Sequence, residues 1–101
     1  MSDQRPSVQS VPTELASLIG KQVVVDTDSS YVYIGMLEAA GADFLTLTSV
    51  DVHDTAESNS TKEQYTHETL KLGGTRHNRK LTYLRLARVL SISALDDVHQ
   101  F

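Results

Sequence analysis

A basic segment in the C-terminal third of the chain could bind phosphate groups. Arg76, His77, Arg79 and Lys80 lie within the stretch TRHNRK, and Arg85 follows in the next apolar segment. The guanidinium of arginine forms paired hydrogen bonds with phosphate oxygens, so these residues are candidates for contacts with a nucleic-acid backbone. The alternative is a solvated loop whose charges keep the joint between two elements soluble.

Charge is unevenly distributed along the chain. The net charge is -4, but residues 1–69 carry three Lys and Arg against eleven Asp and Glu, whereas residues 70–101 carry six against two. The first part therefore has a balance of -8 and the second a balance of +4. Such an asymmetry can mark a nucleic-acid contact. It also fits a basic hairpin that lies against an acidic surface of its own domain or of a neighbouring subunit.

Other polar clusters predict no catalytic or metal site. Asp51 and His53 would share one face of a strand, with Asp54 beside them, but a zinc-type site needs roughly three or four converging ligands. The remaining histidines are scattered. The chain has no cysteine, no Gly-rich phosphate loop and no serine in a nucleophile elbow. We therefore expect no enzyme activity, no metal and no other cofactor.

The composition predicts one soluble, cytoplasmic domain. A chain of 101 residues is long enough for a single modest core. Its longest apolar run, residues 31–37, is far shorter than the roughly 18 residues of a membrane-spanning helix, and no membrane association is expected. The domain is predicted over residues 13–95, with a flexible tail at 1–12 and a second tail at 96–101.

Two short helices are predicted from start and stop signals. The first begins at Thr13, ends at Gly20 and has an apolar stripe along one side. The stripe consists of Leu15, Leu18 and Ile19. The second covers residues 61–71, because Ser60 and Glu63 have the spacing of a capping box.

The other apolar segments predict five strands. These cover residues 22–26, 31–40, 44–53, 81–86 and 89–95. The short turn between the second and third strands indicates an antiparallel hairpin. Gly35 interrupts the second strand, and a lone strand glycine marks a bend or a close approach of another backbone. Five short strands with a bent second strand favour a small barrel over an open sandwich.

The chain resembles the Sm and Sm-like (LSm) family, which includes the bacterial protein Hfq. Gly35 and Leu37 match the glycine and leucine of the family's first motif. In LRLARVLSI, the residues that match the second motif are Leu84, Arg85, Val89 and Ile92. The likeness covers about residues 13–94, apart from an insert over about 54–80 that contains the second helix. It implies a mainly β fold, a strongly bent five-stranded SH3-like barrel with an N-terminal helix.

The resemblance also implies assembly into a ring. In Sm-like rings the fourth strand of one subunit pairs with the fifth strand of the next, which leaves no free edge. A homo-oligomer of about six or seven subunits is therefore expected. The residues expected at the interface are Leu81, Tyr83, Leu84, Val89, Leu90 and Ile92. A monomeric barrel of SH3 type is the alternative.

RNA binding is the function that the resemblance implies. Arg85 holds the position of the motif arginine, and Asp43 lies near the acidic or Asn position in the turn between strands two and three. This turn lacks the aromatic or His and the Asn with which RNA-binding members stack and read a base. Leu86 replaces the glycine after the motif arginine, which removes a close approach of the backbone. The candidate RNA-binding residues are Asp43, Arg76, Arg79, Lys80 and Arg85.

Several residues have a second interpretation. Arg85 could pair with an acidic residue such as Asp43, across the pore rim or a subunit contact, instead of binding RNA. Arg88, in the link between the last two strands, is expected to be a solvated charge. The tyrosines at 31, 33 and 83 alternate as core residues do, so no stacking role is expected for them. A ring-forming scaffold that binds a protein partner through residues 61–71 is the alternative function.

Overall fold

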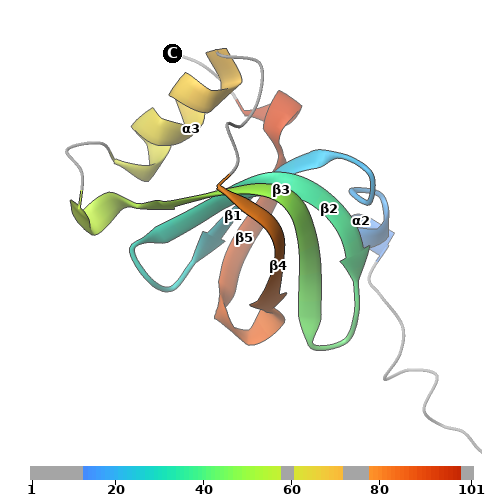
Figure 1. Cartoon of the computed structure of the whole chain (residues 1–101). Helices are drawn as coiled ribbons and strands as arrows, with labels where there is room; N and C mark the ends of the chain where they lie inside the picture. The colour runs from blue at the N-terminus through green and yellow to red at the C-terminus, as the bar shows by residue number, and fades with distance from the viewer. Residues whose placement is uncertain (1–12, 58–60, 72–77, 99–101) are drawn as a thin grey trace, which may run out of the picture.

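In the part of the chain that the computed structural model describes, residues 13–57, 61–71 and 78–98, five strands form one antiparallel sheet (Figure 1). The strands are Gln22–Thr27 (β1), Tyr31–Ala40 (β2), Phe44–Asp54 (β3), Arg79–Arg85 (β4) and Val89–Ala94 (β5). Their order in the sheet is β4-β3-β2-β1-β5. β4 and β5 are therefore its two edges, and the prediction of a mainly β fold with five strands is confirmed.

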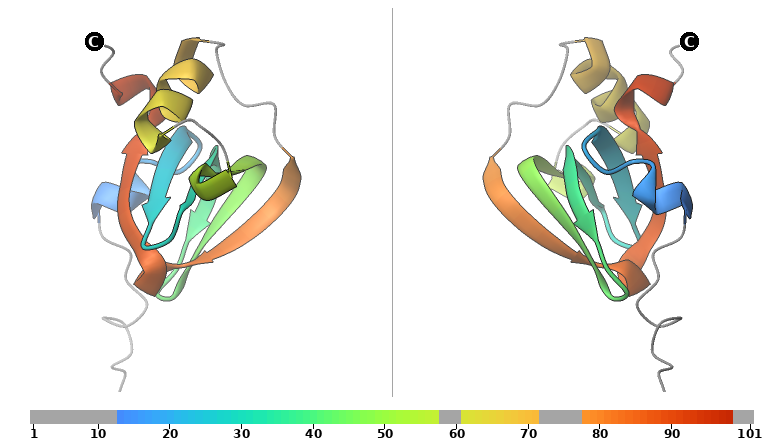
Figure 2. Two further views of the ribbon diagram at one scale, coloured as in Figure 1. Left: turned by 90° about the vertical axis from the view of Figure 1, so that its left-hand side faces the viewer. Right: turned by 90° about the vertical axis from the view of Figure 1, so that its right-hand side faces the viewer.

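Short helical segments join and flank the strands. The α-helices are Thr13–Ala16 (α2) and Lys62–Lys71 (α3), and the 3-10 turns are Thr55–Glu57 (η1), Leu86–Arg88 (η2) and Leu95–Asp97 (η3). α3 and η3 lie at the same end of the sheet in both views of Figure 2. None of the helices in the described ranges is long and apolar enough to cross a membrane. The cytoplasmic location stays a prediction.

The first helix is shorter than predicted. It ends at Ala16, and the chain continues in turns to Gly20, whose φ of +89° is the left-handed conformation of a helix stop. Leu15 and Leu18 pack against the core as the stripe predicted, whereas Ile19 is 44% exposed.

The core is built from alternate residues of the strands, as the period of two in a β-strand requires. Its buried members include Val23, Val25, Leu37, Leu45, Leu47, Val50 and Leu84. In the first half of β2 the buried residues are Val32 and Ile34, so the tyrosines at 31 and 33 lie on the opposite face. Tyr33 is half-buried against the core, but the prediction of a core position is wrong for Tyr31 and Tyr83, which are 41% and 63% exposed.

A bulge in β3 lies against the glycine of β2. The register between the two strands shifts beside Gly35, where β3 has one more residue than β2, and Ser49 has a positive φ of 50°. A Cβ atom on Gly35 would lie 3.0 Å from the carbonyl oxygen of Thr48 and 3.2 Å from Cα of Val50. The predicted close approach of another backbone is confirmed.

The inserted helix α3 begins with a capping box one residue later than predicted. The side chain of Thr61 accepts a hydrogen bond from the Gln64 N–H at 3.1 Å, and the side chain of Gln64 accepts one from the Thr61 N–H at 2.9 Å. The predicted partner Ser60 lies outside the described residues. The reciprocal pair satisfies two N–H groups at the start of the helix.

α3 is attached to β3 through an aromatic stack. The ring of Tyr65 lies parallel to the ring of His53, with centroids 4.1 Å apart and planes within 8°. The buried Thr66 and Thr69 donate their hydroxyl hydrogen bonds to carbonyl groups of the same helix. The side of α3 that faces the sheet therefore needs no polar partner from the strands for these two residues.

Arg88 is exposed, as its position in the link predicted, but it also forms an ion pair that was not predicted. Its Nε donates hydrogen bonds to both carboxylate oxygens of Asp28, at 2.9 and 2.7 Å, in the turn between β1 and β2. These bonds raise the pKa of the Arg88 guanidinium. The partner lies 60 residues away in the sequence, which is why local pattern did not reveal it.

Candidate functional site

The turn between β2 and β3 and the link between β4 and β5 form a hollow together. Both lie at the end of the sheet away from α3 (Figure 1). Phe44 and Arg85 are paired in the register of β3 and β4, and one residue further on the Leu86 N–H donates to the Asp43 carbonyl at 2.9 Å. The hollow has a volume of about 650 Å³. Its lining residues are Ala42, Asp43, Phe44, Arg85, Leu86 and Ala87.

Three chemically different side chains converge at this hollow. The guanidinium carbon of Arg85 lies 5.8 Å from the centroid of the Phe44 ring, within the range of a cation–π contact. Phe44 is 45% exposed, and Asp43 is exposed beside it. An aromatic ring can stack on a nucleobase, a guanidinium can bind phosphate or stack in turn, and a carboxylate can accept hydrogen bonds from base N–H groups.

The structure brings together two of the predicted RNA-binding residues and separates the others from them. Asp43 and Arg85 line the same hollow. Arg79 and Lys80 begin β4, whereas Arg85 ends it. At about 3.3 Å per residue, the strand separates Arg79 from Arg85 by roughly 20 Å. Arg76 lies outside the described residues.

Arg85 forms no ion pair with another residue of the described ranges. Among the residues that the structure describes, the ion pairs are Lys62 with Asp26 and Arg88 with Asp28, so Arg85 and Asp43 do not pair with each other. Both side chains therefore keep their hydrogen-bonding capacity for a ligand. The described part of the single chain has no Arg85–Asp43 ion pair, and a pair across a pore rim or a subunit contact stays a prediction.

Phe44 is the site residue that the sequence reasoning missed. Its signal was present, because an aromatic residue directly follows Asp43 in GADF. The expectation for Leu86 was also wrong. Its backbone does approach the turn closely, through the hydrogen bond to Asp43, while its half-buried side chain packs against the core. Glycine is not required for this approach, because the Leu86 side chain finds space against the core.

A second hollow continues the aromatic surface along the outer face of the sheet. It has a volume of about 680 Å³ and shares Ala42, Asp43 and Phe44 with the first. The exposed Tyr83 also lines it, and its other lining residues are small. These are Ala39, Ala40, Gly41 and Thr46.

The two edge strands expose large apolar side chains. Leu81 and Tyr83 on β4 and Leu90 on β5 are among the exposed large hydrophobic residues, and Leu90 is 67% exposed. The other residues predicted at a subunit interface have contacts within their own chain. Leu84 belongs to the core, and Val89 and Ile92 pack against it.

The described residues contain no cluster of three or more His, Cys, Asp or Glu that could hold a metal ion. The side chains at the end of β3 have other contacts. His53 stacks on Tyr65, and the Asp54 carboxylate accepts hydrogen bonds from Ser30 and from the Ala56 N–H. These bonds lower the pKa of Asp54.

Comparison with known proteins adds no relationship. No model of a known protein family matches the chain, and no curated protein is significantly similar to it in sequence. The function has to be inferred from the hollow and from the sheet edges.

Proposed function

We propose that this protein is an Sm-like ring protein that binds single-stranded RNA in the hollow formed by Asp43, Phe44 and Arg85. The observation that carries the proposal is the Arg85 guanidinium over the Phe44 ring, at the place where the β2–β3 turn meets the β4–β5 link. A base can stack on this aromatic and cationic surface while its N–H groups donate to the Asp43 carboxylate. Because every base can stack, we expect binding to depend little on the RNA sequence.

The order of the sheet supports assembly through its edges. β4 and β5 are at opposite edges, so pairing β4 of one subunit with β5 of the next satisfies both rows of free backbone groups. Such a pairing would cover Leu81, Tyr83 and Leu90, which are exposed in the single chain. The contact is heterologous and closes into a ring if the rotation between subunits permits. A ring would present one RNA-binding hollow from each subunit.

RNA binding is tested by fluorescence anisotropy with U-rich and A-rich oligonucleotides at low salt. Loss of a stacking ring weakens binding by about 1–3 kcal/mol, so we expect Phe44→Ala to raise Kd by about 5- to 150-fold. Arg85→Ala should also weaken binding, and more than Arg79→Ala, its charge-matched control at the other end of β4. Thermal unfolding confirms that each variant is folded.

Two results would contradict the assignment of the site. Unchanged affinity in Phe44→Ala would refute stacking in the hollow. A loss confined to Arg76→Ala and Arg79→Ala would assign RNA binding to the basic segment instead. Absence of any binding at micromolar protein would refute RNA binding itself.

Assembly is tested by the native mass of the protein, measured by light scattering with and without nuclease treatment. We expect a homo-oligomer of about six or seven subunits and its loss in Leu90→Lys, which places a charge on the edge strand. Ile19→Lys is the matched control, because Ile19 is also an exposed apolar residue but lies in the turn after α2, outside both edge strands. A monomeric wild type would refute the ring.

The alternative of a scaffold that docks a partner on α3 has less support. Tyr65 faces His53 of the same chain, and the exposed residues of α3 are all polar. They are Glu63, Gln64, Glu68 and Lys71. This face lacks the buried apolar anchors on which most stable interfaces depend.

A further inference from the structure

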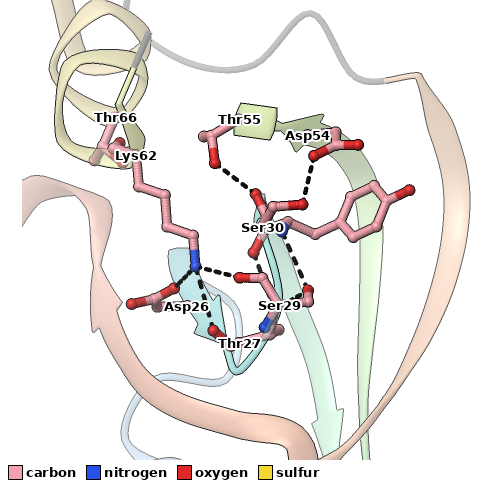
Figure 3. A network of polar contacts seen from close by, with 9 residues as sticks. Asp26, Thr27, Ser29, Ser30, Asp54, Thr55, Lys62 and Thr66 are labelled. Carbon is pink, nitrogen blue, oxygen red and sulfur yellow. Dashed lines mark hydrogen bonds and ion pairs between the residues drawn. The ribbon is translucent and has the colours of Figure 1, made fainter. Parts of the chain in front are cut away.

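The turn between β1 and β2, residues 28–30, is bonded to three separate parts of the chain. One of them is the end of β3. The Ser30 hydroxyl donates to the Asp54 carboxylate, and both the N–H and the hydroxyl of Thr55 donate to the Ser30 carbonyl, at 3.0 and 2.8 Å (Figure 3). These bonds fix the turn to the strand that precedes the inserted helix.

The second part is the inserted helix itself. The Lys62 ammonium, at the first residue of α3, reaches into the turn and donates to the Asp26 carboxylate (Figure 3). It also donates to the carbonyl of Ser29 at 2.7 Å and to that of Thr27 at 3.2 Å. The three oxygens use the full donor capacity of the ammonium group. The start of α3 and the β1–β2 turn therefore hold each other in place.

The third part is η2, the link between β4 and β5. Asp28 binds Arg88 twice, since its carboxylate accepts from Arg88 Nε and its own N–H donates to the Arg88 carbonyl at 3.0 Å. At the other end of η2, the Leu86 N–H is bonded to Asp43. Leu86 and Ala87 also line the hollow that contains Arg85. The link η2 is thus hydrogen-bonded at both ends, to Asp43 in the β2–β3 turn and to Asp28 in the β1–β2 turn.

We propose that Asp28 is a positioning residue for the RNA-binding hollow, holding η2 through Arg88 so that Arg85 stays over Phe44. The Lys62 contact connects the inserted helix to the same turn, so the insert supports the hollow without touching it. This inference rests on the proposed function. Asp28 itself does not line the hollow.

The direction in which Kd changes when the charge of Asp28 is removed distinguishes a positioning role from simple electrostatic repulsion. A carboxylate near bound RNA repels phosphate, so its removal by Asp28→Asn should tighten binding if Asp28 has no other role. A positioning role predicts the opposite. We expect Asp28→Asn to raise Kd for a U-rich oligonucleotide by about two- to fivefold, the effect of losing one exposed ion pair.

Matched variants complete the measurement in the full-length chain. Asp97→Asn makes the same charge change on η3 and should leave Kd unchanged or slightly lower. Exchanging the partners, Asp28→Arg with Arg88→Asp, keeps the net charge and should restore most of the affinity that Arg88→Asp alone loses. The slope of Kd against salt should stay constant in Asp28→Asn, because no phosphate contact is removed.

A second readout needs no RNA. Amide hydrogen exchange of Leu86, measured by NMR in the free protein, should accelerate in Asp28→Asn and not in Asp97→Asn, at equal global stability. If the wild type binds RNA but Asp28→Asn binds it equally or more tightly, the positioning role is overturned and the proposed function stands. If the wild type binds no RNA, the proposed function fails. If the exchange rate of the Leu86 amide is also unchanged in Asp28→Asn, Asp28 does not hold η2 in place, and the positioning role is overturned as well.

Discussion

Gly35 gives a prediction whose magnitude follows from the bulge of β3. In Gly35→Ala, the new methyl group would lie 3.0 Å from a backbone oxygen and 3.2 Å from a backbone carbon of β3. These distances are shorter than ordinary van der Waals contacts, which begin near 3.5 Å for carbon. These two neighbours are backbone atoms of a strand that also pairs with β4, and the third, Cγ2 of Val50 at 3.2 Å, belongs to a fully buried side chain, so none of them can move away easily.

Two opposing terms decide the effect of Gly35→Ala on the free energy of unfolding. Overpacking of this kind costs about 1–3 kcal/mol. Replacing glycine by alanine also restricts the unfolded chain, which returns roughly 0.4–1 kcal/mol. We therefore expect a net destabilisation of about 1–2 kcal/mol, or a Tm lower by about 5–12 °C in a domain of this size.

Urea and thermal unfolding followed by circular dichroism measure this difference. Gly41→Ala is the matched control, because a Cβ atom there would meet only the Phe44 carbonyl at 3.7 Å. It should leave stability unchanged or raise it slightly. Equal stability of Gly35→Ala and Gly41→Ala would show that the β3 bulge yields freely, and the argument that Gly35 is needed for the bend would be refuted.

Two further predictions concern the dependence of stability on pH. Burial, with the Asp51 carboxylate as a smaller cause, raises the pKa of Tyr65 above its ordinary 10.0. The tyrosine therefore ionises at a lower pH in the unfolded chain than in the folded protein. The stability of the wild type should fall as pH rises past about 10. Tyr65→Phe should remove this decline in urea titrations at alkaline pH, and an identical decline in the variant would contradict it. The hydrogen bonds from Ser30 and the Ala56 N–H lower the pKa of Asp54 below 3.8, so the stability that they provide is present above that pH and is lost as pH falls through the lowered value. Asp54→Asn should therefore flatten the acid limb of the stability curve, and an unchanged limb would count against the Ser30–Asp54 bond.

Local pattern predicted β1, β2 and β3 well because alternate residues of these strands are buried along much of their length. The predicted ranges for β1, β2 and β3 differ from the observed ones by at most one residue at an end. The close approach at Gly35 was also predictable, because a glycine inside a strand has few physical explanations. The prediction of a core position was wrong for Tyr31 and Tyr83, because alternation shows which residues share a face of the sheet but not which face is buried.

The site was only partly predictable because its geometry depends on pairing between distant strands. Asp43 and Arg85 were identified through the family resemblance, yet Phe44 faces Arg85 only because β3 and β4 pair in one particular register. A shift by one residue would turn Phe44 to the other face of the sheet. The contacts of Asp28 with Arg88 and of Lys62 with Asp26 join residues 60 and 36 positions apart, for which sequence spacing gives no signal.

The separation of the basic residues changes the meaning of the positive charge in residues 70–101. In the sequence this charge is one block, but β4 carries Arg79 and Lys80 at one end and Arg85 at the other, while Arg88 is paired with Asp28. The basic residues behind the +4 balance therefore do not form a single binding patch. Arg85 is the arginine that lies beside an exposed aromatic ring and an exposed carboxylate. That combination offers stacking as well as charge, and stacking is the part of single-strand recognition that salt does not screen.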